Sequence, residues 1–206
     1  LFDITEVRKG GTVLREGGSL SDIVVKGVLL RDAKGNLIEN ASGYQYDETQ
    51  EIKLGRSTPD FQMGWRNTLS YKNIDLSFLI NGSFGGIVLS GTQPYLDAYG
   101  VSKASADARD NGGVVVNGKK YDAQKYYNTI KDLPGYYSYD ATNVRLQELA
   151  VSYTFPTKWF KKKIDELTVS VIGNNVWMIY NKAPFDPELT PSTATYGQGN
   201  DYFMQP

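Results

Sequence analysis

The chain has 206 residues, a formal net charge of -1, and neither cysteine nor histidine. Without cysteine it has no disulfide framework or thiolate metal site. Without histidine it lacks the commonest general base and the commonest transition-metal ligand. A Ser-His-Asp enzyme and a zinc enzyme are therefore excluded, and we expect no catalytic residue, no metal site and no cofactor. The small net charge gives no long-range field, so no nucleic-acid partner is expected either.

The composition favours strands and turns, because 15 Tyr, 8 Phe and 3 Trp accompany 21 Gly. No apolar run approaches the roughly 18 residues of a transmembrane helix. The mean hydropathy of -0.40 still allows a membrane barrel, since only every second residue of a barrel strand faces lipid. The opening stretch, LFDITEVRKGG, has neither a signal-peptide pattern nor an initiator methionine, so we expect it to continue a longer protein.

The first sixty residues give weak patterns. Two stretches, FDITEV and DIVVKGVLL, are plausible strands, and RDAKGNLIENASG is rich in turn residues around Lys34-Gly35-Asn36. The clear alternation starts at Gly64 and predicts strands at about 64–72 and 74–86. Asn73, between them, suits the positive φ of a tight hairpin turn.

The pattern is lost over residues 91–140, where a short helix is possible around residues 102–109. Alternation then returns and predicts strands at about 144–155 and 166–179. Short turns join each pair of strands, whereas long polar segments at about 91–141 and 181–206 follow them. Segments of this length without regular structure are usually functional.

Two classes of protein fit this alternation. The first two strands match the roughly 9–11 residues that cross a bilayer in a barrel, and aromatic residues lie toward their ends. Short turns at one side and long loops at the other are typical of outer-membrane barrels. A soluble extracellular β-sandwich that binds glycan or mediates adhesion would alternate in the same way. Periodicity alone leaves both interpretations open.

Several stretches, in order along the chain, resemble SusC/RagA-type TonB-dependent outer-membrane transporters. They are REGGSLSDI, LGRSTPDFQMGWRNTLSYKNIDLSFLINGSFGG, NVRLQELAVSYTFPTKWFKK, VSVIGNNVWMI and FDPE. The resemblance is most secure over residues 50–188, and the set is specific although each member alone is weak. Asn174 departs from the family, which usually has arginine there.

The resemblance implies an all-β fold of antiparallel transmembrane strands, the C-terminal part of a barrel of about 22 strands with a plugged lumen. The plug domain and the final strand would be absent from these residues, and the segments at about 91–141 and 181–206 would be extracellular loops. The complete protein would lie in the bacterial outer membrane and import oligosaccharides or peptides. Its partners would be a SusD-like surface lipoprotein, TonB acting through the plug region, and outer-membrane lipid.

The two predicted faces supply the candidate residues for lipid contact. The apolar side chains of alternate positions would face acyl chains, and their polar neighbours would line the lumen. The predicted lipid-facing set is Trp65, Leu69, Tyr71, Ile74, Leu76, Phe78, Ile80, Phe84, Leu149, Val151, Tyr153 and Phe155.

The long loops supply the candidates for substrate binding, because tyrosine can stack on sugar rings and acids can bond to hydroxyl groups. The set is Tyr95, Asp97, Tyr99, Tyr136, Tyr137, Tyr139 and Tyr196, with Asn111 and Asp140 as polar neighbours. Packing within the loops is the simpler explanation for any one tyrosine. Asp186-Pro187-Glu188 is a weak calcium pattern and better suits a shaped loop. Lys161–Lys163 could attract anionic headgroups or simply lie in a solvated turn.

Overall fold

A computed structural model describes residues 6–9, 12–15, 17–19, 21–160, 164–188 and 200–201. It is mostly antiparallel strands with few helices, which confirms the predicted all-β class. The chain divides into two compact units. Unit 1 comprises Leu1–Thr58, Gly86–Asp140 and Phe185–Pro206, and unit 2 comprises Pro59–Gly85 and Ala141–Pro184. Among the described residues, no helix has the length and apolar character needed to cross a membrane.

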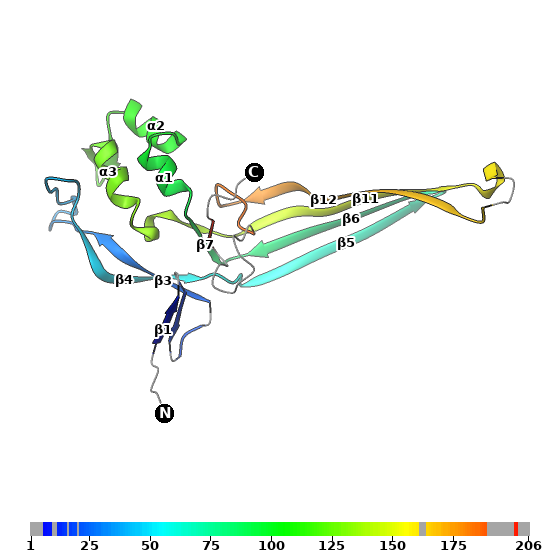
Figure 1. The fold of residues 1–206 in the computed structure, drawn as a ribbon, viewed down its shortest axis with the longest axis horizontal. Helices are drawn as coiled ribbons and strands as arrows, with labels where there is room; N and C mark the ends of the chain where they lie inside the picture. Colours follow the sequence, from blue (N-terminus) through cyan, green and yellow to red (C-terminus); the bar gives the residue numbers. More distant parts are fainter. Residues whose placement is uncertain are drawn as a thin grey trace. The chain divides into compact units, whose positions relative to one another are not determined.

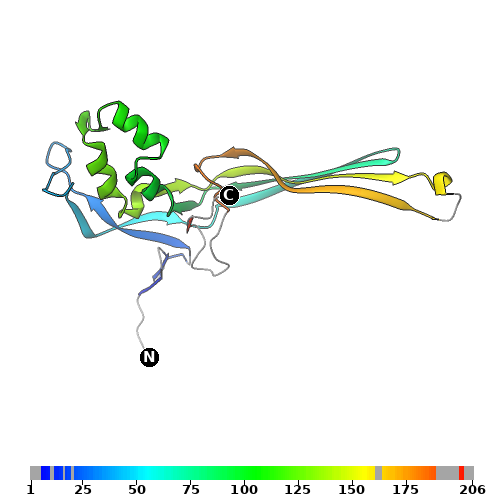
Figure 2. The same cartoon turned by 45° about the horizontal axis from the view of Figure 1, so that its top comes forward.

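Unit 2 is a four-stranded antiparallel sheet in the order β12-β11-β6-β5 (Figure 1). Its strands are β5 (Phe61–Tyr71), β6 (Ile74–Phe84), β11 (Asn143–Phe155) and β12 (Leu167–Asn181), and a 3-10 turn η2 (Thr157–Phe160) follows β11. The first strand starts three residues earlier than the alternation suggests, and the last continues to Asn181. The four strands twist together as one layer (Figure 2), as the right-handed twist of β-strands requires.

The β5–β6 hairpin turns differently from the sequence prediction. Lys72, not Asn73, takes the positive φ, at 56°. Asn73 instead joins this turn to β11 of the neighbouring hairpin. Its side-chain amide donates to the Thr154 carbonyl at 2.6 Å, and the Thr154 backbone amide donates to the Asn73 carbonyl at 2.8 Å. The hydrogen-bonding side chain thus ties two strand ends together, while the long lysine adopts the conformation that asparagine was expected to take.

Unit 1 contains a second sheet in the order β1-β2-β3-β4. Its strands are β1 (Glu6–Lys9), β2 (Thr12–Arg15), β3 (Asp22–Leu29) and β4 (Tyr46–Arg56). A smaller sheet has β7 (Ile87–Ser90) between β10 (Ser138–Asp140) and β13 (Asn200–Asp201), and β8 (Val114–Val116) pairs with β9 (Lys119–Tyr121). β4 is absent from the sequence prediction, because YDETQEIKLGR has no clean alternation.

The segment that lost its pattern contains three short helices, α1 (Gln93–Ala98), α2 (Lys103–Asp110) and α3 (Ala123–Ile130), and the 3-10 turn η1 (Pro134–Tyr137). The helix expected around residues 102–109 is α2. Ser102 caps it by accepting from the Ser105 amide, and Asp122 caps α3 by accepting from the Lys125 amide.

Leucine and tyrosine share the main buried cluster of unit 1. The main cluster is Leu29, Leu37, Tyr44, Tyr121, Ile130, Leu133 and Tyr137, against which Val116, Tyr126, Tyr127 and Tyr139 pack half-buried. A second cluster joins Ile23, Val25 and Leu89. Of the three helices, α3 packs into this core, through Ile130, Tyr126 and Tyr127.

Candidate functional site

The sheet of unit 2 has one apolar face. Strand register shows this directly, because residues paired across neighbouring strands point to the same side. Trp65 pairs with Ile80, Ile80 with Leu146, and Leu146 with Trp177, so two tryptophans end one row across all four strands. Trp65 and Phe78 also meet edge to face at 5.3 Å between ring centroids.

The register brings all twelve predicted lipid-facing residues to this apolar face. None of them is buried, and Tyr71 and Trp65 are 70% and 55% exposed. No other element of unit 2 covers them among the described residues, so this sheet is not one half of a β-sandwich within its unit. The face also carries Phe61, Met63, Val169 and Val171, which the predicted set leaves out.

The opposite face is mainly polar. Ser152 and Ser170 share a hydrogen bond at 2.8 Å, and Thr154 and Thr168 share one at 2.9 Å. Arg66 reaches Glu148, two strands away, with both guanidinium nitrogens, at 3.3 and 3.1 Å. The apolar exceptions on this face are Leu79, Ala150, Ile172 and Met178.

Aromatic rings gather toward the two ends of the apolar face. Phe61 stacks on Phe84 at one end, and Tyr153, Phe155 and Trp159 make successive ring contacts toward the other. Ten residues separate Phe61 from Tyr71 along β5, which is about 34 Å of strand. At a tilt of about 45° this corresponds to about 24 Å, close to the roughly 25 Å apolar band of a membrane barrel.

The predicted substrate-binding residues separate into three groups. Tyr95 and Tyr99 are exposed, the latter by 79%. Asp97 and Tyr137 are buried, at 6% and 2% exposure, and Tyr139 packs on the core and contacts the Phe185 ring edge to face. Tyr136 forms the third group by itself: it is 36% exposed, and its hydroxyl accepts a hydrogen bond from the Leu29 backbone amide at 3.4 Å. Tyr196 lies outside the described residues.

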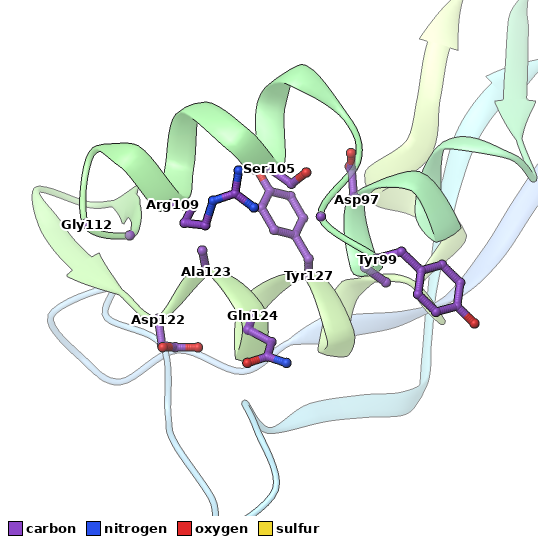
Figure 3. Close-up of a pocket in the computed structure, with 12 residues that line it drawn as sticks. Asp97, Tyr99, Ser105, Arg109, Gly112, Asp122, Ala123, Gln124 and Tyr127 are labelled. Atoms are coloured by element: carbon purple, nitrogen blue, oxygen red, sulfur yellow. The ribbon is translucent and has the colours of Figure 1, made fainter.

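A cavity of about 510 Å³ lies between the three helices of unit 1. It brings together two of the predicted residues, Asp97 and Tyr99, whereas Tyr95, Tyr136, Tyr137 and Tyr139 do not line it. Figure 3 shows Asp97 near the end of α1, Arg109 from α2 and Tyr127 from α3 around this space, whereas the ring of Tyr99, the residue that follows α1, points away from it. We call this cavity the three-helix pocket.

The carboxylate of Asp97 shapes the electrostatics beside this pocket. It accepts a hydrogen bond from the side-chain Nε2 of Gln93 at 2.8 Å. Burial, together with the negative charge of Asp97, raises the pKa of Tyr127, Tyr137 and Tyr139. The Tyr137 hydroxyl makes no well-formed hydrogen bond within the described part of the chain. These tyrosines therefore ionise less readily than an ordinary tyrosine.

The remaining sequence candidates give no site. The Glu188 amide donates to Asp186 at 3.0 Å, which is the local turn that a DPE motif would form. No cluster of three or more potential metal ligands occurs among the described residues. Lys161–Lys163 lie outside them.

Sequence reasoning missed Arg109, Ser105, Asp122 and Tyr127, which also line the three-helix pocket. Of these, Asp122 could have been suspected from a cap pattern, since it is the N-cap of α3. The close approach of Gly113 to the Tyr121 carbonyl, at a φ of 132°, shapes the same region and leaves no space for a side chain there.

Comparison with known proteins fits the two-faced sheet. No protein-family model matches the chain. TonB-dependent receptor P3 of Formosa agariphila is 30% identical over 169 residues, which are 76% of this chain and 16% of that relative. TonB-dependent receptor P26 of the same organism is 26% identical over 152 residues, 66% of this chain and 14% of the relative.

Solved structures show the same fold. The RagAB peptide importer matches with a TM-score of 0.59 in its closed-closed state, at 16% identity, covering 87% of this chain and 22% of the importer chain. In its open-open state the TM-score is 0.60 at 15% identity, covering 97% and 22%. The ordered motifs, the alternating strands and these relatives agree, and the chain belongs to the SusC/RagA-type TonB-dependent receptors.

Proposed function

We propose that the complete protein is an energised importer of nutrients, to which this chain contributes barrel wall and extracellular loops. The family places the protein in the bacterial outer membrane. The cargo would be oligosaccharides or, as in the RagAB importer, peptides. The chain spans 16% and 14% of the lengths of the two receptors it matches, so the cargo and the partners belong to the proposal.

The observation that carries the proposal is the pair of unlike faces on a sheet that no other described element of unit 2 covers. A strand at the boundary between hydrocarbon and a wet lumen needs an apolar side chain at every second position and polar groups between them. The register of β5, β6, β11 and β12 gives this arrangement row by row. The polar face, with Arg66, Glu148 and the serine and threonine pairs, would line the lumen.

The partners follow from the family resemblance. A SusD-like surface lipoprotein would cover the extracellular mouth, and TonB would transmit energy through a plug domain. Residues 91–141 and 181–206 would then be extracellular, on the side where cargo arrives. No reaction on the cargo is proposed, because import needs binding and passage and the chain has no histidine or cysteine for common catalytic devices.

Uptake in cells tests this function. Deleting the full-length gene should abolish growth on one glycan or peptide source, and the intact gene should restore it. Deleting tonB in the same strain should give the same loss. Unchanged uptake of every tested nutrient in the deletion strain, with the protein detected in the outer membrane of the parent, would contradict the proposal.

A further inference from the structure

We propose that one end of the unit 2 sheet binds the headgroup of an anionic phospholipid. The residues are Tyr71 and Lys72 at the β5–β6 turn and Lys158 and Trp159 in η2, and we call these four the headgroup site. The inference rests on the proposed function: the strand ends that lead into the long loops would be extracellular, so this opposite end faces the periplasm. The periplasmic leaflet of an outer membrane consists of phospholipid, which is therefore the lipid within reach.

The two segments of the headgroup site lie at the same end of the sheet (Figure 1). The reciprocal hydrogen bonds between Asn73 and Thr154 hold the β5–β6 turn beside the end of β11. Lys158 follows shortly after Thr154, and the Trp159 backbone amide donates to the Pro156 carbonyl at 3.0 Å. Hydrogen-bonded turns therefore present both segments together at one end of unit 2.

The ammonium group of Lys72 lies on the lipid-facing side. The φ of Lys72 is 56°, and its Nζ atom lies 5.1 Å from the centroid of the Tyr71 ring. Tyr71 belongs to the apolar face and is 70% exposed. An ammonium group has three donors, so one that rests on an aromatic ring can still donate to a phosphate. Long lysine side chains place their charge at a membrane boundary in this way.

Trp159 extends the apolar face beyond β11. Its ring centroid lies 5.8 Å from that of Phe155, and its side chain remains 65% exposed. Tryptophan at the edge of an apolar band is typical of the headgroup region, because its ring can contact hydrocarbon while the indole N–H donates to a polar group. The preceding residue, Lys158, is exposed as well. The turn therefore offers a positive charge next to an indole donor.

The charges at this end favour an anion on the lipid-facing side. Among the described residues, neither Lys72 nor Lys158 makes an ion pair. The register places Asp75 on the polar face, and Glu166 accepts from the Thr168 hydroxyl of that same face. In the sequence of the two segments lysines outnumber acids, with Lys72, Lys158 and Lys161–Lys163 against Asp75, Asp165 and Glu166. A phosphate beside Tyr71 and Trp159 would therefore meet net attraction.

The class of headgroup follows from its charge. Phosphatidylglycerol keeps the single negative charge of its phosphate, whereas phosphatidylethanolamine carries an ammonium group of its own. Two lysines without an ion pair therefore favour phosphatidylglycerol. A basic residue near an anionic lipid surface contributes about 1 kcal/mol, which corresponds to about a fivefold change in affinity.

Native mass spectrometry of the purified full-length transporter tests the site. The protein in detergent is mixed with equal amounts of phosphatidylglycerol and phosphatidylethanolamine, and the ratio of the two bound lipids is measured. We expect the parent to favour phosphatidylglycerol, and Lys72→Asn and Lys158→Gln each to lower the ratio about two- to fivefold. Asparagine tolerates the positive φ of position 72, so this change removes the charge without straining the turn.

Lys72→Arg keeps the charge and should keep the ratio. Lys103→Gln, which removes an exposed charge from α2, is the matched control and should also leave the ratio unchanged. Trp159→Ala should weaken the retention of both lipids with little change in their ratio, because the ring contact does not depend on the headgroup charge. Lys161–Lys163 stay unchanged in every variant, and heat-modifiable migration on gels checks that each variant is folded.

Equal binding of the two lipids by the parent would overturn the inference, and so would equal ratios for the parent and the double variant Lys72→Asn/Lys158→Gln. Tighter binding of lipid A than of phosphatidylglycerol at these lysines would also overturn it, since lipid A belongs to the extracellular leaflet. Any of these results with normal nutrient uptake would leave the proposed function standing. Unchanged uptake after deletion of the gene, together with a clear preference for phosphatidylglycerol, would contradict only the function.

Discussion

Adjacent residues on β6 point into different surroundings. Leu76 lies on the apolar face between Leu69 and Val151, whereas Ser77 lies on the polar face between Thr68 and Ala150. In the proposed barrel, the side chain of Leu76 would therefore face the hydrocarbon of the bilayer, and the side chain of Ser77 would face the lumen.

We expect Leu76→Arg to destabilise the folded full-length protein by about 2–4 kcal/mol, because a charge near the bilayer midplane is costly. Ser77→Arg, the matched control, should cost much less, since the lumen can hydrate it. Denaturant unfolding in phospholipid vesicles measures both. A harmless Leu76→Arg beside a severe Ser77→Arg would reverse the assignment of faces.

Because the hydroxyl of Tyr137 is buried, we expect the free energy of unfolding to fall as the pH rises into the alkaline range. Burial and the nearby Asp97 raise the pKa of Tyr137 above its ordinary value of 10.0. Because the folded-state pKa is the higher one, this contribution to stability is complete below about pH 10 and is lost as the pH rises further.

We therefore expect Tyr137→Phe to match or slightly exceed the parent in stability at pH 7, since it removes a hydroxyl without a well-formed partner. Above about pH 10 the parent should lose up to about 1.4 kcal/mol per pH unit relative to the variant. Thermal unfolding from pH 7 to 11 measures the difference. Identical pH profiles would show that Tyr137 ionises as easily in the folded protein as in the unfolded chain.

At the scale of elements, the hairpin ends are tied together by Asn73. We expect Asn73→Ala to cost about 0.5–1.5 kcal/mol, because it removes the bond to the Thr154 carbonyl. Ser70, on the same hairpin, makes no side-chain hydrogen bond within the described part of the chain, so Ser70→Ala should be near neutral. Denaturant midpoints give the comparison, and equal effects of the two changes would assign Asn73 no role in joining the hairpins.

The long strands could be predicted because period-two alternation is a property of neighbouring residues. β5, β6, β11 and the start of β12 keep that alternation over whole strands. β4 could not be found, because polar residues occupy both of its faces over Tyr46–Glu51. The turn at Lys72 was assigned to the wrong residue, since Asn73 has a tertiary hydrogen bond that no local rule reveals.

The three-helix pocket was harder to predict from the sequence than the long strands were. Its helices have six to eight residues, too short for a decisive periodicity, and the local signs are the caps Ser102 and Asp122 and the proline in the first turn of α1. Asp97 and Tyr99 were expected to meet cargo for their chemistry alone. That Arg109 and Tyr127 join them depends on how three separate helices pack, which needs coordinates.

At the scale of the whole molecule, the sheet of unit 2 is open at both sides. Within the described residues, β5 and β12 each pair on one side only. Unpaired backbone groups at a sheet edge are expensive in hydrocarbon.

We expect residues 1–206 expressed alone to aggregate rather than insert into lipid vesicles, while the full-length protein inserts. The readout is heat-modifiable migration after refolding into vesicles, with the full-length protein as control. Stable insertion of the short piece as a monomer would show that its edges close on themselves.

The row that runs from Trp65 to Trp177 has a spectroscopic consequence. The sequence has 3 tryptophans, and the third, Trp159, lies beyond Phe155 near the opposite end of the same face. These tryptophans should therefore lie at different depths in the bilayer. Quenchers attached at known positions along the acyl chains should each reduce the fluorescence of the tryptophan at the matching depth. In a full-length protein whose other tryptophans are replaced by phenylalanine, emission excited at 295 nm reports on this sheet, because unit 1 contributes no tryptophan to residues 1–206.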